Sequence, residues 1–292
     1  MENKKMVSVI IPTYNDWDRL SLCIEALKKQ TYPVESFEVI IVNNDPEDIA
    51  PELCLADNFQ LITEARPGSY SARNAALAIT KGEIIAFTDS DCIPDKDWII
   101  NAVARLEAGA ERVAGRVELF FKSNKLTLVE IYEKAYAFDQ ESNAKGGGSV
   151  TANMITWRKH FDTVGWFNDS LMSGGDNEWG WRANDLGIPI QYAPEVVVKH
   201  PARDSLVAML QKRRRVAGGA VNIDRKETRQ SLLMLLIRGY LPPVRALFKP
   251  WRKTEMTFSE KLIAMSMVYY FKFYSTTYKI GLLLGIKKPE RV

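Results

Sequence analysis

Two carboxylates stand two residues apart directly after a short apolar run. The run covers residues 84–87, and Asp89 and Asp91 follow it with Ser90 between them. Side chains two apart on an extended backbone point to the same side, so both carboxylates can face one ion. Such oxygens suit Mg²⁺ or Mn²⁺, ions that also bind the phosphate oxygens of substrates. The pattern therefore indicates a metal site, with an Asp-Ser-Asp turn that closes a strand as the ordinary alternative.

The two carboxylates follow a series of strands that alternate with helices. Apolar runs predict strands at residues 7–12, 37–42, 60–63 and 84–87, and helical spacing predicts helices at 17–30 and 71–79. This alternation indicates an α/β fold with a mostly parallel central sheet flanked by helices. Ligands bind at the carboxyl ends of such strands, which is where Asp89 and Asp91 are expected to lie.

Helices and strands continue after the carboxylates. Apolar spacing predicts helices at 98–107 and 126–138 and a strand at 114–121. A further helix is expected to begin within residues 173–182 and to end near Gly187. The last predicted strand covers 190–199, is interrupted at Pro194 and leads to His200.

Composition limits the class of protein. A chain of 292 residues, 46% hydrophobic and 26% charged, suits one large domain or a domain with an appendage. A net charge of +3 gives no general affinity for polyanions, so no nucleic-acid partner is expected. Three unclustered cysteines argue for a reducing compartment and against both a disulfide framework and a zinc site. A strand-like run from Val7 leaves no room for a signal peptide, and we expect a cytoplasmic-facing protein.

The tail beyond about Gln211 is richer in basic and aromatic residues. Residues 262–286 are strongly apolar but contain Lys272 and Lys279, and central lysines are costly in a membrane span. The pattern favours basic amphipathic helices in the membrane interface over a helical subdomain packed on the core, and over a true span. We expect a first domain at 1–222 and a helical, membrane-associating C-terminal extension at 223–292.

Five motifs in a fixed order carry a family resemblance. They are Pro-Thr-Tyr-Asn at 12–15, Asn-Asn-Asp at 43–45, Ser-Ala-Arg-Asn-Ala at 71–75, Asp-Ser-Asp at 89–91, and Gly-Trp-Phe at 165–167 with Gly-Gly-Asp-Asn-Glu-Trp-Gly-Trp-Arg at 174–182. Over about residues 6–220 the chain resembles the inverting nucleotide-sugar glycosyltransferases of family 2, which have the GT-A fold. Each motif alone is weak, whereas the five together are specific.

The resemblance implies a nucleoside diphosphate-sugar donor held with Mn²⁺ or Mg²⁺. By resemblance, Asp89 lies near the ribose and the metal, Ser90 belongs to the same site, and Asp91 coordinates the metal that holds the diphosphate. His200 completes the metal site in similar enzymes, with a surface turn as the alternative. Arg73 meets the base or the phosphates, which suits its planar, permanently charged head, with a surface arginine as the alternative.

The resemblance also implies a pocket for the base. Pro12, Thr13, Tyr14 and Asn15 line it by resemblance, with a plain turn as the alternative. Asn43 stands where many relatives carry an aspartate that accepts a hydrogen bond from uracil, and an amide both donates and accepts. A UDP-sugar is the first choice of donor, and a GDP- or dTDP-sugar stays open.

Inversion in one displacement needs a base that takes the proton of the acceptor hydroxyl. Family members carry it as the aspartate of a Glu-Asp pair that opens a helix, and the matching residues here are Gly175 and Asp176. Asp176 is the first candidate, Glu178 is its rival, and a helix cap is the structural alternative for Asp176. Trp179 and Trp181 would either shape a sugar pocket or pack in the core.

The implied activity is that of a hexosyltransferase-type enzyme. It would transfer a single sugar to a glycan acceptor, expected to be lipid-linked, at the inner face of the cell membrane, as in surface polysaccharide assembly. The alternatives are a sugar-phosphate nucleotidyltransferase and a catalytically silent carbohydrate-binding or scaffold protein. The basic run at 211–215 would close over the diphosphate, contact anionic lipid, or lie on a solvated surface.

Overall fold

The computed structural model describes residues 4–227 and 237–288. The chain forms two compact units whose segments alternate along the sequence. Unit 1 takes residues 1–118, 138–170 and 175–200, and unit 2 takes residues 119–137, 171–174 and 201–292. The predicted tail residues 228–236 and 289–292 lie outside the described part of the chain.

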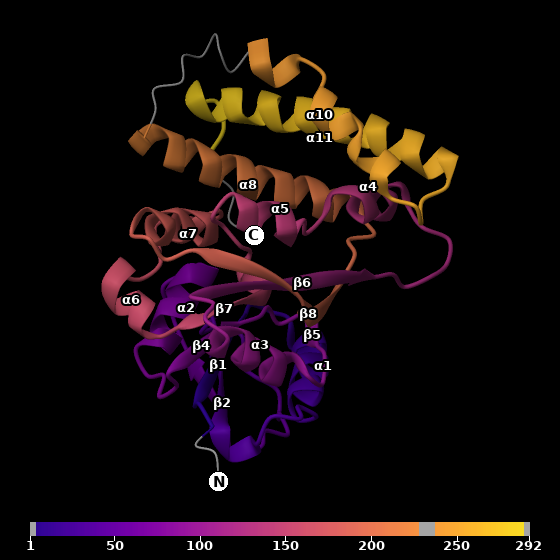
Figure 1. Cartoon of the computed structure of the whole chain (residues 1–292). Helices are drawn as coiled ribbons and strands as arrows, with labels where there is room; N and C mark the ends of the chain where they lie inside the picture. Colours follow the sequence, from indigo (N-terminus) through magenta and orange to yellow (C-terminus); the bar gives the residue numbers. More distant parts are fainter. Residues whose placement is uncertain (1–3, 228–236, 289–292) are drawn as a thin grey trace. The chain divides into compact units, whose positions relative to one another are not determined.

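Unit 1 is built on a sheet whose first half is parallel (Figure 1). Strands β1 (Val7–Thr13), β2 (Phe37–Asn43), β3 (Phe59–Thr63) and β4 (Ile84–Phe87) lie in the order β3-β2-β1-β4 with parallel ladders. Helix α1 (Trp17–Leu27) connects β1 to β2, and α2 (Ser69–Leu77) connects β3 to β4. The predicted alternation of strands and helices is confirmed, and the carboxyl ends of these strands share one edge of the sheet.

The second half of the sheet contains antiparallel pairs. It adds β7 (Met154–Trp157), β6 (Arg112–Phe120), β8 (Ile190–Pro201) and β5 (Ile93–Pro94), in the order β4-β7-β6-β8-β5. β7 is antiparallel to both β4 and β6, and β5 is antiparallel to β8. The sheet is therefore parallel in its first four strands and mixed as a whole. The sequence did not predict the antiparallel pairs, because a short apolar run does not specify the direction in which a strand pairs.

The predicted interruption of the last strand at Pro194 is wrong, because β8 is continuous from Ile190 to Pro201. β5 pairs with β8 only at Val198 and Lys199. Pro194 lies outside that ladder, so its missing N–H costs no hydrogen bond to β5. Proline is tolerated in strands at such positions.

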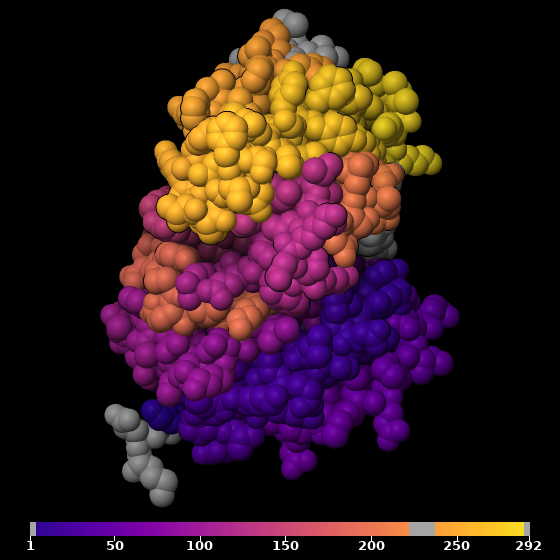
Figure 2. Space-filling model, turned by 90° about the vertical axis from the view of Figure 1, so that its right-hand side faces the viewer, coloured from indigo at the N-terminus to yellow at the C-terminus, as the bar shows by residue number. Residues whose placement is uncertain are grey.

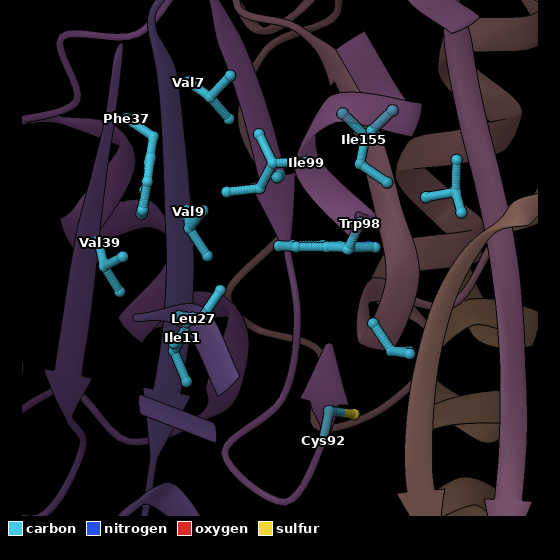
Figure 3. Close-up of a cluster of buried hydrophobic side chains, with 14 of the residues drawn as sticks. Val7, Val9, Ile11, Leu27, Phe37, Val39, Cys92, Trp98, Ile99 and Ile155 are labelled. Atoms are coloured by element: carbon cyan, nitrogen blue, oxygen red, sulfur yellow. The ribbon is translucent and has the colours of Figure 1, made fainter. Parts of the chain in front are cut away.

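One face of the sheet packs against α1 and α3 (Trp98–Glu107). Val7, Val9 and Ile11 alternate along β1 and point to the same side, where Trp98 and Ile99 of α3 meet them (Figure 3). All five side chains are 0–1% exposed. This period-2 pattern is what a buried strand requires, because successive side chains leave opposite faces.

The opposite face carries an aromatic cluster. Phe87 at the end of β4 lies 5.8 Å from the ring of Phe161 in α6 (Lys159–Val164) and 5.4 Å from Phe167. Phe161 stacks on Trp179 of α7 (Gly175–Asp185) at 4.6 Å, and Phe167 contacts Tyr70 of α2 at 5.6 Å. The cluster joins the strand that precedes Asp89 to the helix that carries Asp176. The short helix α5 (Gln140–Lys145) completes the helices of unit 1.

Unit 2 is helical. Within the described residues its helices are α4 (Leu128–Tyr136), α8 (Leu206–Glu227), α10 (Val244–Leu247) and α11 (Phe258–Leu283), with the 3-10 helix η3 (Lys249–Arg252). Tyr132 of α4, Met209 of α8 and Phe271 of α11 share one buried cluster, so α11 packs inside the unit. No helix in the described ranges is long and apolar enough to span a membrane. The expected boundary at residue 222 falls within α8 and stays a prediction.

The basic run of α8 is partly used inside unit 2. Lys212 Nζ lies 3.2 Å from the buried carboxylate of Glu133, which also accepts hydrogen bonds from the backbone and the guanidinium of Arg203. Burial alone would raise the pKa of Glu133, but Lys212 and Arg203 hold it below its ordinary value. Burial, with Arg203 as a second cation, lowers the pKa of Lys212 to about 8. Arg213 donates to the hydroxyl of Tyr132, so a purely solvated run is wrong for these residues.

Candidate active site

Asp89 follows β4 and pairs with an arginine from α2. Arg73 donates from Nη2 to Asp89 Oδ1 at 2.5 Å and from Nη1 to the carbonyl of Ser69 at 3.3 Å. The side chain of Arg73 is 3% exposed, against 34% for Asp89. The alternative of a surface arginine is therefore wrong. The structure places Arg73 and Asp89 together as a buried ion pair at the carboxyl end of β4, and their contact with a donor stays a prediction.

Asp91 lies beside His200. The antiparallel pair β5–β8 sets Ile93 opposite Lys199, which brings the next residue of β8 to the Asp-Ser-Asp segment. His200 Nε2 is 3.4 Å from Asp91 Oδ2, and its ring packs on Phe138 at 4.5 Å. His200 is 3% exposed, so the alternative of a surface turn is wrong.

A third possible ligand, Cys92, belongs to the core. Among the described residues, ligand atoms of Asp91, Cys92 and His200 lie within 4.8 Å of one another, and Asp89 is not in this group. Cys92 is fully buried in the same apolar cluster as Trp98, as Figure 3 shows. Burial raises the pKa of its thiol well above the ordinary range, as for a cysteine that packs in the core. Asp91 and His200 are therefore the side chains of this group that remain as candidate metal ligands.

The loop after β1 borders the same carboxylates. Arg19 of α1 places Nη1 3.6 Å from Asp91 Oδ2 and donates from Nε to Asp16 Oδ1 at 2.6 Å. Ser90, which is buried, donates its hydroxyl to Asp16 Oδ2 at 3.1 Å. Ser90 thus ties the Asp-Ser-Asp segment to this loop.

The residues predicted to line a base pocket lie at the carboxyl end of β1. Pro12 and Thr13 are buried, and Thr13 is opposite Asn43 in the β1–β2 ladder. Tyr14 is 57% exposed. Asn15 has a φ of +49°, which asparagine tolerates, and it donates to Asp45 Oδ2 at 3.1 Å. The structure brings these residues together, and their contact with a base stays a prediction.

Both polar atoms of the Asn43 side-chain amide form hydrogen bonds within the loop that follows β2. Its Nδ2 donates to the carbonyl of Asp48 at 2.9 Å, and its Oδ1 accepts from the backbone N–H of Asp45 at 3.0 Å. An aspartate could accept the second bond but could not donate the first. The departure from the family pattern at this position therefore has a structural reason, which is closure of the turn after β2.

Asp176 is a buried carboxylate in the first turn of α7. Its Oδ1 accepts from the hydroxyl of Tyr70 at 3.1 Å and from the N–H of Asn177 at 3.0 Å, and its Oδ2 lies 3.4 Å from the N–H of Thr151. Burial raises its pKa, while these donors and the nearby charge of Arg73 act in the opposite direction. α7 begins at Gly175, and Asp176 accepts from the N–H of Asn177 in the first turn, so a structural role at the start of the helix stays beside the role of base.

Glu178 is committed to an ion pair. Arg182, four residues on, donates from Nε to Glu178 Oε1 at 2.7 Å and from Nη2 to Oε2 at 3.1 Å. Both carboxylate oxygens are thereby bound to one guanidinium. This geometry favours Asp176 over Glu178 as a proton acceptor.

The two tryptophans of α7 have different surroundings. Trp179 is fully buried, donates to the carbonyl of Gly165 at 2.7 Å and stacks on Phe161, so it packs in the core. Trp181 is 43% exposed. Of the two, only Trp181 has an exposed face that a sugar ring could contact.

Comparison with known proteins identifies the family. The model of "Glycosyl transferase family 2" matches residues 8–164. The chain is 34% identical over 276 residues to glycosyltransferase AglE of Haloferax volcanii, with 90% of each chain covered. The chain belongs to glycosyl transferase family 2. It is a glycosyltransferase, and this family favours transfer of a sugar over the nucleotidyl transfer and the silent scaffold that were the alternatives.

Two further relatives extend the comparison. The UDP-Glc:alpha-D-GlcNAc-diphosphoundecaprenol beta-1,3-glucosyltransferase WfgD of Escherichia coli is 36% identical over 164 residues, which is 55% of this chain and 56% of WfgD. The mannosyltransferase PcManGT of Pyrobaculum calidifontis, solved with GDP-Man and Mn²⁺, aligns with a TM-score of 0.60 at 18% identity, over 98% of this chain and 89% of that one. The latter likeness supports the GT-A fold expected from the sequence.

Several residues of this family 2 site were not singled out by the sequence. Arg19 borders Asp91, Tyr70 donates to Asp176, and the buried Asn44 donates to the carbonyls of Glu64 and Arg66 and accepts from the N–H of Gly68. The bonds of Asn44 fix the approach to α2. No short spacing pattern marks contacts between residues so far apart in the chain, although Tyr70 adjoins the Ser-Ala-Arg-Asn-Ala motif.

Proposed function

We propose that this glycosyltransferase transfers a single sugar, with inversion, from a nucleoside diphosphate-sugar to a lipid-linked glycan acceptor. The observation that carries the proposal is the arrangement of unit 1. Asp89 and Asp91 follow the carboxyl end of β4, where Arg73 of α2 pairs with Asp89 and His200 of β8 lies beside Asp91. The buried carboxylate of Asp176 is joined to the same helix as Arg73 through Tyr70.

The donor side of the proposal rests on charge and on unpaired polar atoms. Thr13 Oγ1, Thr88 Oγ1 and Arg73 Nε are buried and have no hydrogen-bond partner among the described residues. Buried polar atoms of this kind are nearly always paired in native proteins, so they fit a polar ligand at the ends of β1 and β4. Because Asn43 is occupied by its own loop, the nearby backbone is the expected source of contacts to the base. A UDP-sugar stays the first choice, with GDP- and dTDP-sugars as alternatives.

The residues present fit a divalent cation. Asp91 and His200 supply a carboxylate oxygen and an imidazole nitrogen, a pair that suits Mn²⁺ better than Mg²⁺ because imidazole is a softer ligand. The solved relative named above contains Mn²⁺. The cation would stabilise the negative charge that develops on the diphosphate as the sugar bond breaks. Asp89 is proposed to take part through the ribose and through Arg73.

The acceptor side of the proposal assigns the proton transfer. The acceptor oxygen forms a bond to the anomeric carbon as the bond from that carbon to the diphosphate breaks. Asp176 takes the hydroxyl proton, and the diphosphate leaves with the electron pair of the broken bond. A raised pKa makes the carboxylate a better proton acceptor than an exposed aspartate, which suits a general base.

A panel of nucleotide-sugars tests the activity. The full chain is incubated with UDP-, GDP- and dTDP-sugars, Mn²⁺ and a short polyprenyl-diphosphate saccharide, and both nucleoside diphosphate and glycan product are measured. One donor is expected to give both products, and NMR of the glycan should show the anomeric configuration inverted. Retained configuration, or no turnover and no calorimetric binding with any donor, would overturn the proposal.

The membrane part of the proposal rests on an exposed aromatic and basic group in unit 2. The ring of Trp251 lies 5.8 Å from that of Phe258, and Lys261 Nζ lies 5.6 Å from the centre of the Trp251 ring. Trp251 is 45% and Phe258 66% exposed, and the segments that carry them are orange and yellow in Figure 2. Aromatic rings beside cations suit the headgroup region of an anionic membrane. WfgD has an undecaprenol-linked acceptor in its name, which agrees with a reaction at the inner face of the cell membrane.

Vesicle sedimentation tests the membrane part. The full chain is expected to sediment with vesicles that contain phosphatidylglycerol and to stay in solution with phosphatidylcholine alone. Trp251→Ser combined with Phe258→Ser should lose this binding. Trp166→Ser is the matched control, because Trp166 in unit 1 is 47% exposed. Equal sedimentation of the double variant and the native chain would contradict a role for this group.

A further inference from the structure

Gly175 occupies the position where family members carry the glutamate of a Glu-Asp pair. A Cβ atom at this position would lie 2.8 Å from Cε2 of Tyr70 and 3.0 Å from both Cδ2 and Cζ of the same ring. Carbon atoms do not approach so closely without displacement, and the ring is not the end of a flexible chain. Gly175 and Tyr70 are therefore sterically matched, and no larger residue fits at position 175 while the ring stays in place.

The ring of Tyr70 is fixed by its surroundings. It is 5% exposed, contacts Phe167 at a ring distance of 5.6 Å, and lies 5.8 Å from the guanidinium carbon of Arg73. Its hydroxyl donates to Asp176 Oδ1. The absence of a side chain at position 175 thus allows an aromatic donor to reach the carboxylate that follows it.

We propose that Tyr70 is a positioning residue for the catalytic base, with Gly175 as its steric counterpart. The inference deepens the proposed function and rests on Asp176 being the base. Tyr70 and the N–H of Asn177 both donate to Oδ1, whereas the partner of Oδ2 among the described residues is the more distant N–H of Thr151. The arrangement directs Oδ1 into the protein and assigns Oδ2 as the atom that receives the acceptor proton.

The charged groups around Asp176 show how the Tyr70 hydroxyl affects the pKa of this carboxyl. Tyr70 and Arg73 face it from α2, and Glu178 on its own helix is neutralised by Arg182. A donated hydrogen bond stabilises the ionised carboxylate and therefore lowers its pKa, which opposes the effect of burial. Tyr70 itself stays protonated, because burial and the neighbouring carboxylate raise the pKa of its phenol. The hydroxyl thus keeps Asp176 ionised as well as oriented.

Tyr70→Phe removes the hydroxyl and keeps the ring that packs on Gly175 and Phe167. We expect the acidic limb of the kcat/KM profile to move to higher pH by about one unit, because a hydrogen bond to a charged group is lost. On that limb the rate should fall about tenfold, with donor KM unchanged. Tyr32→Phe is the matched control, since Tyr32 is also buried and donates to a backbone carbonyl, that of Lys5, at 2.7 Å.

Gly175→Ala supplies an independent variant that retains the hydroxyl. The added methyl group should displace the ring of Tyr70 and shift the acidic limb in the same direction. Both variants are compared with the native chain by thermal melting, so that loss of fold is seen separately. If Tyr70→Phe melts early, Gly175→Ala decides the question by its pH profile.

The outcomes separate the inference from the function on which it rests. Transfer that survives in Asp176→Asn would overturn the assignment of the base, whatever Tyr70 does. An inactive Asp176→Asn together with native pH profiles for folded Tyr70→Phe and Gly175→Ala would overturn only the role of Tyr70. A shifted limb in both variants, with Tyr32→Phe unchanged, would support it.

Discussion

Asp176→Asn and Glu178→Gln form a matched pair of substitutions on one helix. Each replaces a carboxylate by its amide two residues from the other, so size and helix context are nearly equal. Asp176 is buried with Tyr70 as donor, whereas Glu178 is held at both oxygens by Arg182. We expect Asp176→Asn to abolish transfer and Glu178→Gln to affect mainly stability.

The magnitudes follow from these surroundings. Loss of a general base lowers kcat by about 10²–10⁴-fold. The Glu178–Arg182 pair is of the i,i+4 type, and such pairs contribute about 0.3–0.5 kcal/mol when exposed. Arg182 also donates to the carbonyls of Val164 and Trp166. Those bonds are kept in Glu178→Gln. The free energy of unfolding should therefore fall by at most about 1 kcal/mol, which is equivalent to roughly 2–4 °C in Tm.

The stability of Asp176→Asn should change in the opposite direction. Burial raises the pKa of Asp176 above its unfolded value, so the ionised carboxylate destabilises the fold at neutral pH. This cost is absent at low pH, where the group is protonated in both states. It grows as pH rises from the unfolded pKa to the raised folded pKa and is constant above that. Asp176→Asn is therefore expected to melt at or above the native temperature, as removal of catalytic charges often stabilises.

Three measurements on each variant decide the matter. Transfer rate at saturating donor reports the base, calorimetry with the donor and Mn²⁺ reports the donor site, and thermal melting reports the fold. Native donor affinity with lost transfer in Asp176→Asn is the expected combination. The reasoning would be refuted by a larger loss of transfer in Glu178→Gln than in Asp176→Asn, or by donor binding lost in Asp176→Asn.

Further predictions concern the metal, unit 2 and the donor arginine. His200→Ala should weaken Mn²⁺ binding by at least tenfold in a calorimetric titration, with Cys92→Ala unchanged; equal weakening in both would contradict the ligand assignment. Glu133→Gln should destabilise the fold by about 3 kcal/mol, because buried cations lose their carboxylate. The difference in unfolding free energy between the native chain and Glu133→Gln should be complete above pH 4.5 and disappear as pH falls through the lowered pKa of Glu133. A difference that stays constant with pH in urea melts would contradict this prediction. Arg73→Lys should weaken donor binding about tenfold, because an ammonium cannot make both of the bonds that the guanidinium makes, and native affinity would argue against the donor role.

The parallel half of unit 1 was the most predictable part of the fold. Each of its strands is a short apolar run that ends in polar residues, and the helices between them have regular apolar spacing. The signal is local, because burial of both faces of a parallel strand requires a continuous apolar run. The carboxyl-end placement of Asp89 and Asp91 follows directly from that pattern.

The antiparallel half was less predictable. β7 is a four-residue strand whose partners, β4 and β6, are set by long-range pairing. β5 covers two residues and has no periodicity at all, yet its pairing with β8 brings His200 to Asp91. The family resemblance, rather than any local pattern, predicted His200 for this site.

The sequence predicted that the tail is helical, but it did not predict which parts of the protein the helices pack against. The apolar residues of α11 satisfy both a membrane-facing helix and a helix packed in a protein, because both environments favour the same side chains. In the structure Phe271 and Ala264 are buried inside unit 2, whereas Phe258 and Phe273 are exposed. Which side chains of an apolar helix become buried depends on α4 and α8, and both of these helices lie more than 30 residues away in the sequence.

Two departures from the family pattern, at Asn43 and Gly175, have different physical origins and different consequences. Asn43 is explained within its own loop, because both ends of its amide are bound by backbone groups of residues 45 and 48. Gly175 is explained only by a residue from another element, since its missing side chain leaves room for the ring of Tyr70.

Tyr70 and Arg73 lie three residues apart on α2, a spacing that places both on one face of the helix. Arg73 binds the carboxylate that follows β4, and Tyr70 binds the carboxylate of α7. One helix therefore contacts both the carboxylate that follows β4 and the carboxylate proposed as the base, so the distance between the two carboxylates depends on α2. Since Asn44 accepts a hydrogen bond from the N–H of Gly68 at the start of that helix, the Asn-Asn-Asp turn after β2 helps to fix the position of α2 and so of both of these α2 side chains.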